Sequence, residues 1–273
     1  MTQTNALPDM ARELRFYPST GTDPRHLTQA QVKQYNDKGY VYPLDVFTST
    51  EAEANRAYFE HLMALSAARG HNQYSINCWH HLCGGIWDLA TDPRILDLVE
   101  DLLGPNLICT MTHYFAKMPG DTKQVAWHQD ASYWPLTPSK VVTVWLAIDD
   151  VDDDNGPMMF IPGSHVHGQI PFDKSTAEDN NVLNQSVRDP ENWGGAPVSV
   201  TMKAGQVSLH TDLLLHGSEP NRSQRRRCGL TLRYHPPDVR RREPEQAPGI
   251  VCRGGDASGY WQPVSRAQGD NIP

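Results

Sequence analysis

Two short segments of this sequence carry side chains that could bind one metal ion. His128 and Asp130 are separated by a single residue, and His216 follows the apolar run 213–215. Residues two apart on a β-strand point to the same side, so one short strand can present an imidazole and a carboxylate to one ion. Two histidines and one carboxylate on one face of an octahedron are typical of non-haem Fe(II) sites that activate O₂. A lone His-x-Asp motif arises by chance in many sequences, so the prediction depends on its surroundings.

An arginine follows His216 at a spacing that suits a co-substrate site. Arg227 comes eleven residues later, at the start of a predicted strand. A dicarboxylate that chelates iron at one end needs a buried cation at the other, and a planar guanidinium can bind it through two hydrogen bonds. Strand alternation places Arg233 on the same face as Arg227. A shift of one residue would instead turn Arg225 or Arg226 inward.

The N-terminal part of the chain, about 25–105, is predicted to form a mostly helical layer. Two of its helices open with capping boxes, in which a hydroxyl residue is followed three positions later by Glu or Gln. These pairs are Thr28 with Gln31 and Thr50 with Glu53. The third helix starts at Pro93, a residue favoured in a first turn. The predicted helices span 28–39, 50–70 and 93–104.

Residues from about 106 to 240 have the character of a β domain. Short segments rich in β-branched and aromatic residues alternate with Pro, Gly, Asn and Asp clusters, a pattern typical of a sandwich or barrel. The predicted strands are 108–115, 141–148, 158–161, 198–202, 207–215 and 230–234. The polar region 172–197 is predicted to be a lid-like insertion. Residues 241–273 are expected to form a C-terminal tail of the same single domain, 1–273.

Composition narrows the possible partners. A net charge of −8 argues against nucleic-acid binding, and no apolar run is long enough to cross a bilayer, so no membrane association is expected. The five cysteines are scattered and form no C-x-x-C pair, which fits free thiols in a reducing compartment. We therefore expect a soluble, cytoplasmic protein that acts on a small molecule. The sequence gives no indication of the oligomeric state.

Three segments of the chain, 114–134, 142–165 and 208–234, resemble the phytanoyl-CoA dioxygenase family, the group that also contains ectoine hydroxylase. The similarity extends over about 39–240. It implies a mainly β fold, a double-stranded β-helix (jelly roll) with flanking α-helices. It also implies that His128, Asp130 and His216 hold Fe(II) and form the catalytic centre, and that Arg227 anchors 2-oxoglutarate with help from Thr143.

The resemblance also indicates the type of reaction. Family members that halogenate lack the carboxylate ligand, whereas this chain keeps Asp130. Hydroxylation is therefore expected, with 2-oxoglutarate and O₂ as co-substrates and succinate and CO₂ as products.

Substrate contacts are predicted from the neighbourhood of these motifs. The candidates are Trp134, Tyr133, Lys117, Gln124, Arg233 and Asn77. The polar segment 71–81, which contains Asn77, is either a capped surface loop or a wall of the substrate site. These residues favour a small polar or anionic metabolite, such as an amino acid derivative or an aminophosphonate. A long apolar chain would need a more apolar wall than the sequence displays.

Two other classes of function are compatible with a metal-binding jelly roll. One is a different metal-dependent enzyme, an isomerase or a hydrolase, which would not need Arg227. The other is a non-catalytic sensor, which is expected to lack at least one metal ligand, whereas His128, Asp130 and His216 are all present.

Overall fold

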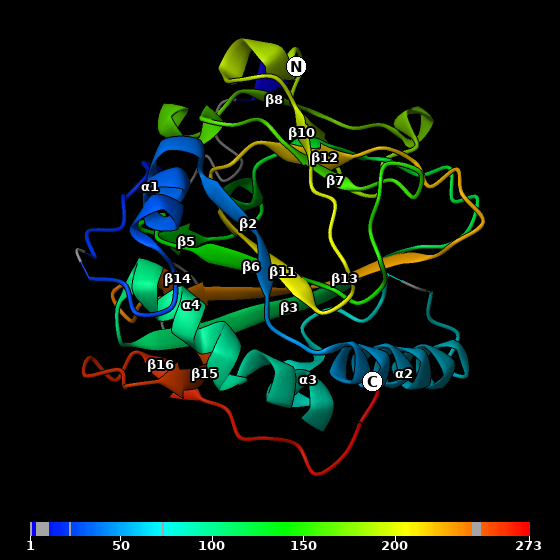
Figure 1. Cartoon of the computed structure of the whole chain (residues 1–273), viewed down its shortest axis with the longest axis horizontal. Coiled ribbons are helices and arrows are strands. Elements are labelled where there is room, and N and C mark those ends of the chain that lie inside the picture. The colour runs from blue at the N-terminus through cyan, green and yellow to red at the C-terminus, as the bar shows by residue number, and fades with distance from the viewer. Residues whose placement is uncertain (1, 4–10, 22, 73, 242–246) are drawn as a thin grey trace.

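Two β-sheets stacked face to face form the centre of the computed structural model, which describes residues 2–3, 11–21, 23–72, 74–241 and 247–273 (Figure 1). The large sheet has the order β16 (Trp261–Pro263), β15 (Ala247–Arg253), β3 (Leu107–Lys117), β13 (Arg227–His235), β6 (Val142–Ala147), β11 (Gln206–Thr211) and β2 (Tyr40–Asp45). The small sheet has the order β10 (Val198–Ser199), β7 (Met158–Phe160), β12 (His216–Ser218) and β4 (Val125–His128). This is the predicted double-stranded β-helix.

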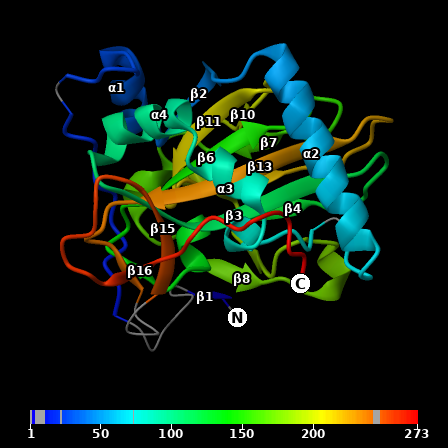
Figure 2. The same cartoon turned by 90° about the horizontal axis from the view of Figure 1, so that it is seen from below.

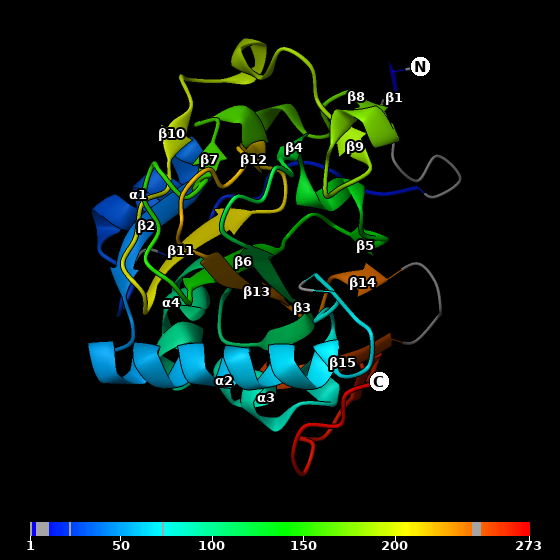
Figure 3. The same cartoon turned by 90° about the vertical axis from the view of Figure 1, so that its right-hand side faces the viewer.

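Helices cover the outer face of the large sheet. α2 (Ser49–Ala67), α3 (Gly84–Ala90) and α4 (Pro93–Leu103) lie on the side away from the small sheet, in front of the large sheet in the view from below of Figure 2 and below it in Figure 3. One buried apolar cluster joins these helices to the sheet, with Phe59 from α2, Val99 from α4 and Leu230 from β13 among its members. The layer order is therefore helices, large sheet, small sheet.

The alternation predicted for β13 is confirmed. Cys228, Leu230 and Leu232 belong to the apolar cluster under the helices, whereas Arg227 and Arg233 face a pocket between the sheets. A strand buried on both faces can carry cations only where they meet partners or a ligand. The inner face of β13 is thus built for chemistry and its outer face for packing.

The helix predictions hold with one correction. Thr28 caps α1 (Gln29–Lys38) in a capping box with Gln31, as predicted. The second capping box is formed by Thr48 and Glu51, not by Thr50 and Glu53. The chain is still extended at Thr48, so this hydroxyl is the first that can accept a bond from the helix, and Thr50 already lies inside it. The short helix α3 was not predicted.

The predicted strand 207–215 is too long. β11 ends at Thr211, and the residues that follow, which begin with Asp212, form a turn in which the Leu214 amide donates to the Thr211 carbonyl. This turn carries the chain from the large sheet to the small one, where His216 begins β12. Sequence pattern alone does not separate a buried turn from the end of a buried strand when the turn continues into an apolar run such as 213–215.

The insertion and the C-terminal region both pack onto the core. The insertion contains β8 (Phe172–Lys174) and β9 (Gln185–Ser186), and its Val187 amide donates to the Trp127 carbonyl beside β4. The region expected as a tail instead adds β15 and β16 to the large sheet. The remaining short elements are β1 (Thr2–Gln3), β5 (Leu136–Thr137), β14 (Arg240–Arg241), η1 (Trp79–His81), η2 (Asp130–Ser132), η3 (Ser164–His167), η4 (Ala177–Asp179) and η5 (Pro190–Trp193). None of the described helices is long and apolar enough to span a membrane.

Candidate active site

The three predicted metal ligands meet between the two sheets. His128 ends β4, His216 begins β12, and these two residues are paired across the small sheet. Asp130 opens the 3₁₀ turn that follows β4. Their candidate ligand atoms all lie within 4.8 Å of one another, and all three residues are buried.

The hydrogen bonds of both histidines fit a metal centre. Nδ1 of His128 lies 2.8 Å from the Ala126 carbonyl, and Nδ1 of His216 lies 2.9 Å from the Leu214 carbonyl. These bonds leave Nε2 of each ring facing Asp130 Oδ1, at 3.8 Å and 3.9 Å. Fixing one ring nitrogen on a carbonyl is the usual way in which a protein orients a metal-binding imidazole. Two nitrogens and one carboxylate oxygen on one side are a suitable donor set for Fe(II).

Charge in the pocket favours the metal-binding protonation states. Burial lowers the pKa of His128 to about 3, with a further contribution from His216, and burial also lowers the pKa of His216. Burial alone would raise the pKa of Asp130, but Arg233 and the two histidines hold it below its usual value. The imidazoles are therefore neutral and the carboxylate ionised at neutral pH.

The second oxygen of Asp130 is held by a row of residues across three strands. His210 on β11, Thr143 on β6 and Arg233 on β13 are direct cross-strand neighbours. The Thr143 hydroxyl donates to Asp130 Oδ2 at 3.1 Å, and Arg233 Nε lies 3.7 Å from the same oxygen. His210 Nε2 lies 4.0 Å away, and neither of its ring nitrogens has a hydrogen-bond partner. This row leaves Oδ1 free to face the histidines.

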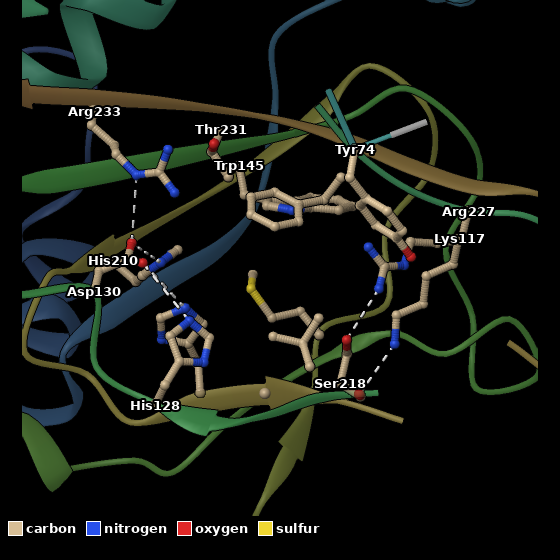
Figure 4. A pocket seen from close by; sticks show the side chains of 15 residues that line it. Tyr74, Lys117, His128, Asp130, Trp145, His210, Ser218, Arg227, Thr231 and Arg233 are labelled. Carbon is tan, nitrogen blue, oxygen red and sulfur yellow. Dashed lines mark hydrogen bonds and ion pairs between the residues drawn. The ribbon is translucent and has the colours of Figure 1, made fainter. Parts of the chain in front are cut away.

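Arg227 lies at the other end of the same pocket, whose cavity volume is about 50 Å³. Its Nε donates to the Gly156 carbonyl at 3.0 Å, and one terminal nitrogen donates to the Ser218 hydroxyl at 3.2 Å. Lys117 is paired with it in the sheet, and its Nζ donates to the Ser218 carbonyl at 3.1 Å. Figure 4 shows Arg227 and Lys117 on one side of the pocket and Arg233 on the other.

Both basic side chains at this end, Arg227 and Lys117, are buried without a paired carboxylate among the described residues. Burial lowers the pKa of Lys117 to about 6, with repulsion from Arg227 adding to the effect, and burial lowers the pKa of Arg227 to about 10. Within the described part of the chain neither side chain forms an ion pair. A buried cation without an anion is costly, so this end of the pocket is prepared for a negatively charged ligand.

The two arginines that precede Arg227 form ion pairs outside the pocket. Arg225 is half exposed and pairs with Asp152, and Arg226 pairs with Asp149 next to the helical layer. Of the three successive arginines, Arg227 is the one that faces the pocket.

Thr143 does not accompany Arg227, contrary to the sequence-based expectation. It is the direct partner of Arg233, six residues along β13 from Arg227, which corresponds to about 20 Å of strand. Thr143 instead orients Asp130. Alternation placed it on the correct face of β6, but only the strand register shows which end of the pocket it serves.

The predicted substrate contacts divide into three groups. Lys117 and Arg233 line the metal pocket. Tyr133 and Trp134 line a second cavity beside it, although the Tyr133 ring lies 5.8 Å from the His128 ring.

Gln124 and Asn77 lie outside both cavities. The Gln124 side chain donates to the Asp179 carbonyl of the insertion, and Asn77 is exposed in a bridge to His113. The polar segment 71–81 runs beside β3 and contributes Tyr74 to the metal pocket and Cys78 to the second cavity.

Several residues of the metal pocket were not among the predicted site residues, and four of them carry polar or aromatic side chains close to the candidate ligands or cations. They are Tyr74, Trp145, His210 and Ser218. Ser218 stands two residues after His216, and Trp145 two after Thr143, so strand periodicity could have identified both. His210 is the register partner of Thr143 and lines the same pocket.

An N-terminal arginine supports the segment that carries Asp130. Arg12 donates from one terminal nitrogen to the carbonyls of Ala131 and Trp134, at 2.7 Å and 2.6 Å. On the same side, Asp212 accepts the Ser139 hydroxyl on both carboxylate oxygens. The segment 130–134 is thus held in place by residues that lie far from it in the sequence.

Comparison with known proteins agrees with this geometry. The family model described as phytanoyl-CoA dioxygenase matches residues 23–229. Bovine peroxisomal phytanoyl-CoA dioxygenase is 32% identical over 150 residues, which cover 53% of this chain and 44% of that enzyme, so the match spans less than half of that relative. A probable alpha-ketoglutarate-dependent hypophosphite dioxygenase of Stutzerimonas stutzeri is 28% identical over 230 residues, covering 77% of this chain and 79% of that protein.

Comparison with a solved structure shows the same relationship at the level of the fold. The apo form of the non-haem monooxygenase ThoJ superposes with a TM-score of 0.76 at 28% identity, covering 87% of this chain and 88% of that one. Together with the family match over most of the sequence, it shows that this chain belongs to the phytanoyl-CoA dioxygenase family, whose enzymes use Fe(II) and 2-oxoglutarate.

Proposed function

We propose that this protein is a hydroxylase that couples oxidation of 2-oxoglutarate to hydroxylation of a small organic anion. In the balanced reaction, R–H, 2-oxoglutarate and O₂ give R–OH, succinate and CO₂. Fe(II), held by His128, Asp130 and His216, would supply the O₂ chemistry. The protein's own contribution is to bind, orient and keep water away from the reactants.

The observation that carries the proposal is the pair of arginines on the inner face of β13. Arg227 presents a guanidinium cation and Lys117 an amine that can be protonated to a ligand at one end of the metal pocket, which suits the far carboxylate of 2-oxoglutarate. Arg233 stands at the other end, beside Asp130. Two anions can therefore approach the metal ligands from opposite sides without competing for the same cation.

The Arg233 end is the better place for the substrate. Among the described residues, the Arg233 guanidinium forms no hydrogen bond, and its buried Nε has only the Asp130 carboxylate as an ion-pair partner, at 3.7 Å. It lies over the Trp134 ring, 4.8 Å from the ring centre. An anionic group on the substrate would satisfy these donors and place a neighbouring C–H bond near the metal centre.

The co-substrate half of the proposal has a direct spectroscopic test. Anaerobic protein loaded with Fe(II) is titrated with 2-oxoglutarate while the weak visible charge-transfer band of the chelate is recorded. We expect Arg227→Ala to need on the order of a hundredfold more 2-oxoglutarate, because truncating one partner of a buried ion pair typically costs 2–5 kcal/mol.

Arg225→Ala is the matched control, since it removes an exposed arginine two residues away and should leave the titration unchanged. Absence of the band in the unaltered protein would refute the proposed function. Equal behaviour of the two variants would refute the role of Arg227.

A further inference from the structure

The second cavity adjoins the metal pocket and has a different chemical character. Its cavity volume is about 380 Å³. Its apolar lining includes Met111, Tyr133, Trp134, Leu136, Trp261 and Val264, and we call it the aromatic chamber. Ligand sites are usually concave, mostly apolar and supplied with a few polar groups, and this chamber has such groups in His80 and Arg241.

The chamber begins where the metal pocket ends. Met111 on β3 is the register partner of Arg233 on β13, so the two side chains stand at the same level of the large sheet. Trp134 lines the chamber and lies under the guanidinium of Arg233, which lines the metal pocket. The Arg233–Trp134 pair is therefore a shared wall between the two spaces.

The far side of the chamber comes from the C-terminal part of the chain. Ala247 on β15 and Trp261 on β16 line it, and Trp261 is fixed by a bond from its Nε1 to the Val239 carbonyl at 3.1 Å. The ring of His235 packs on Trp261 with ring centres 4.7 Å apart. These two contacts hold the Trp261 ring in the chamber wall.

We infer that the substrate is an amphiphilic anion, with its negative group at Arg233 and an apolar or aromatic body in the aromatic chamber. This inference rests on the proposed function and makes its substrate class more specific. A fully polar metabolite would leave the chamber's apolar wall in contact with water, whereas an apolar body would remove both surfaces from water. The apolar wall was not foreseen from the sequence, because its residues come from segments between 78 and 264.

Two probes with the same phosphonate head group distinguish the contribution of the aromatic chamber to binding from that of Arg233. Phenylphosphonate and methylphosphonate are compared by anaerobic calorimetry on protein loaded with Fe(II) and saturating 2-oxoglutarate. We expect phenylphosphonate to bind at least tenfold more tightly. Equal affinity of the two probes would overturn the inference.

A variant that fills the aromatic chamber tests whether the difference in affinity between the two probes arises there. Val264→Trp should reduce phenylphosphonate affinity to that of methylphosphonate, because Val264 is a partly buried residue of the chamber lining. Val166→Trp, the same substitution at a residue that is 60% exposed, should not. If Val264→Trp fails to fold, Met111→Trp fills the chamber from the opposite strand. The inference fails if a folded chamber variant binds phenylphosphonate as the Val166→Trp control does.

The charge-transfer band of 2-oxoglutarate is recorded in the same samples. Loss of the band in the unaltered protein would refute the proposed function. A normal band without discrimination between the probes would refute only the chamber. The two failures are therefore distinguishable.

Discussion

The two ends of the metal pocket differ although they share one strand. Arg227 is fixed by bonds to the Gly156 carbonyl and the Ser218 hydroxyl and has a second cation, Lys117, beside it. Arg233 forms no hydrogen bond among the described residues, lies on Trp134, and borders the aromatic chamber. A preorganised polar site suits a ligand that never varies, and an open, partly apolar site suits a ligand that differs between enzymes of one fold.

The strongest test of this comparison is the charge state of Lys117. In the free protein its pKa is about 6, so it is mostly neutral above that pH. A bound carboxylate raises the pKa of the ammonium group, so 2-oxoglutarate binding should take up a proton above pH 6 and weaken by up to about tenfold per pH unit. Calorimetry in buffers of different ionisation enthalpy measures the uptake.

Lys117→Met should remove that proton uptake and weaken 2-oxoglutarate binding at pH 6 by on the order of a hundredfold. Phenylphosphonate binding at the Arg233 end serves as the control and should be preserved. A pH-independent affinity in the unaltered protein would show that Lys117 is not part of the anion site.

Gly229 lies between the two ends and tests whether the pocket can be narrowed. A Cβ atom at this position would lie 1.9 Å from Cζ2 of Trp145. Gly229→Ala should therefore lower the free energy of unfolding by about 1–3 kcal/mol and displace the indole, which lines the metal pocket. Chemical denaturation measures the first effect.

Gly255→Ala is the control for this substitution, because no atom lies within 4 Å of a Cβ built at Gly255. If both alanine variants are equally stable, the contact between Gly229 and Trp145 is looser than the structure indicates.

Replacing Arg12 should affect ligand binding only at the Arg233 end of the metal pocket. It binds the carbonyls of Ala131 and Trp134, so its removal frees the segment that carries Trp134. Arg12→Ala should lower the free energy of unfolding by about 2 kcal/mol, since two hydrogen bonds from a charged donor are lost. It should weaken phenylphosphonate binding and leave the affinity for 2-oxoglutarate unchanged.

The matched control is Arg15→Ala. Arg15 is a nearby exposed arginine, and its one ion pair within the described chain is with Glu13. A parallel loss of 2-oxoglutarate affinity in Arg12→Ala would show that the two ends are not independent.

The next effect concerns Asp212, behind the segment of Asp130, and is spread over several pH units. Burial raises its pKa to about 7, above the value near 4 expected in the unfolded chain. The folded state therefore holds a proton that the unfolded state has lost between about pH 4 and 7. The stability from this group is fully present below pH 4 and declines by up to about 1 kcal/mol per unit as the pH rises to 7.

Asp212→Asn should flatten this part of the stability profile, as measured by denaturation at several pH values. Asp238→Asn, at an exposed carboxylate, is the control and should keep the slope. An unchanged slope in Asp212→Asn would assign the pH dependence to other groups.

The sequence by itself determined the elements with strong local signals. The capping box of Thr28 and the inner and outer faces of β13 followed from periodicity and side-chain chemistry. The two motifs that bring His128, Asp130 and His216 together were also visible, because ligand types and strand alternation are properties of short segments. The predictions about these residues as iron ligands remain to be tested by metal binding.

Only the tertiary structure decided which end of the pocket each residue serves. Strand register placed Thr143 opposite Arg233 and so made it a partner of Asp130 instead of Arg227. The aromatic chamber depends on segments that lie as far apart as Cys78 and Val264. Register and such long-range contacts arise from the packing of the whole chain, and local sequence carries no direct record of them.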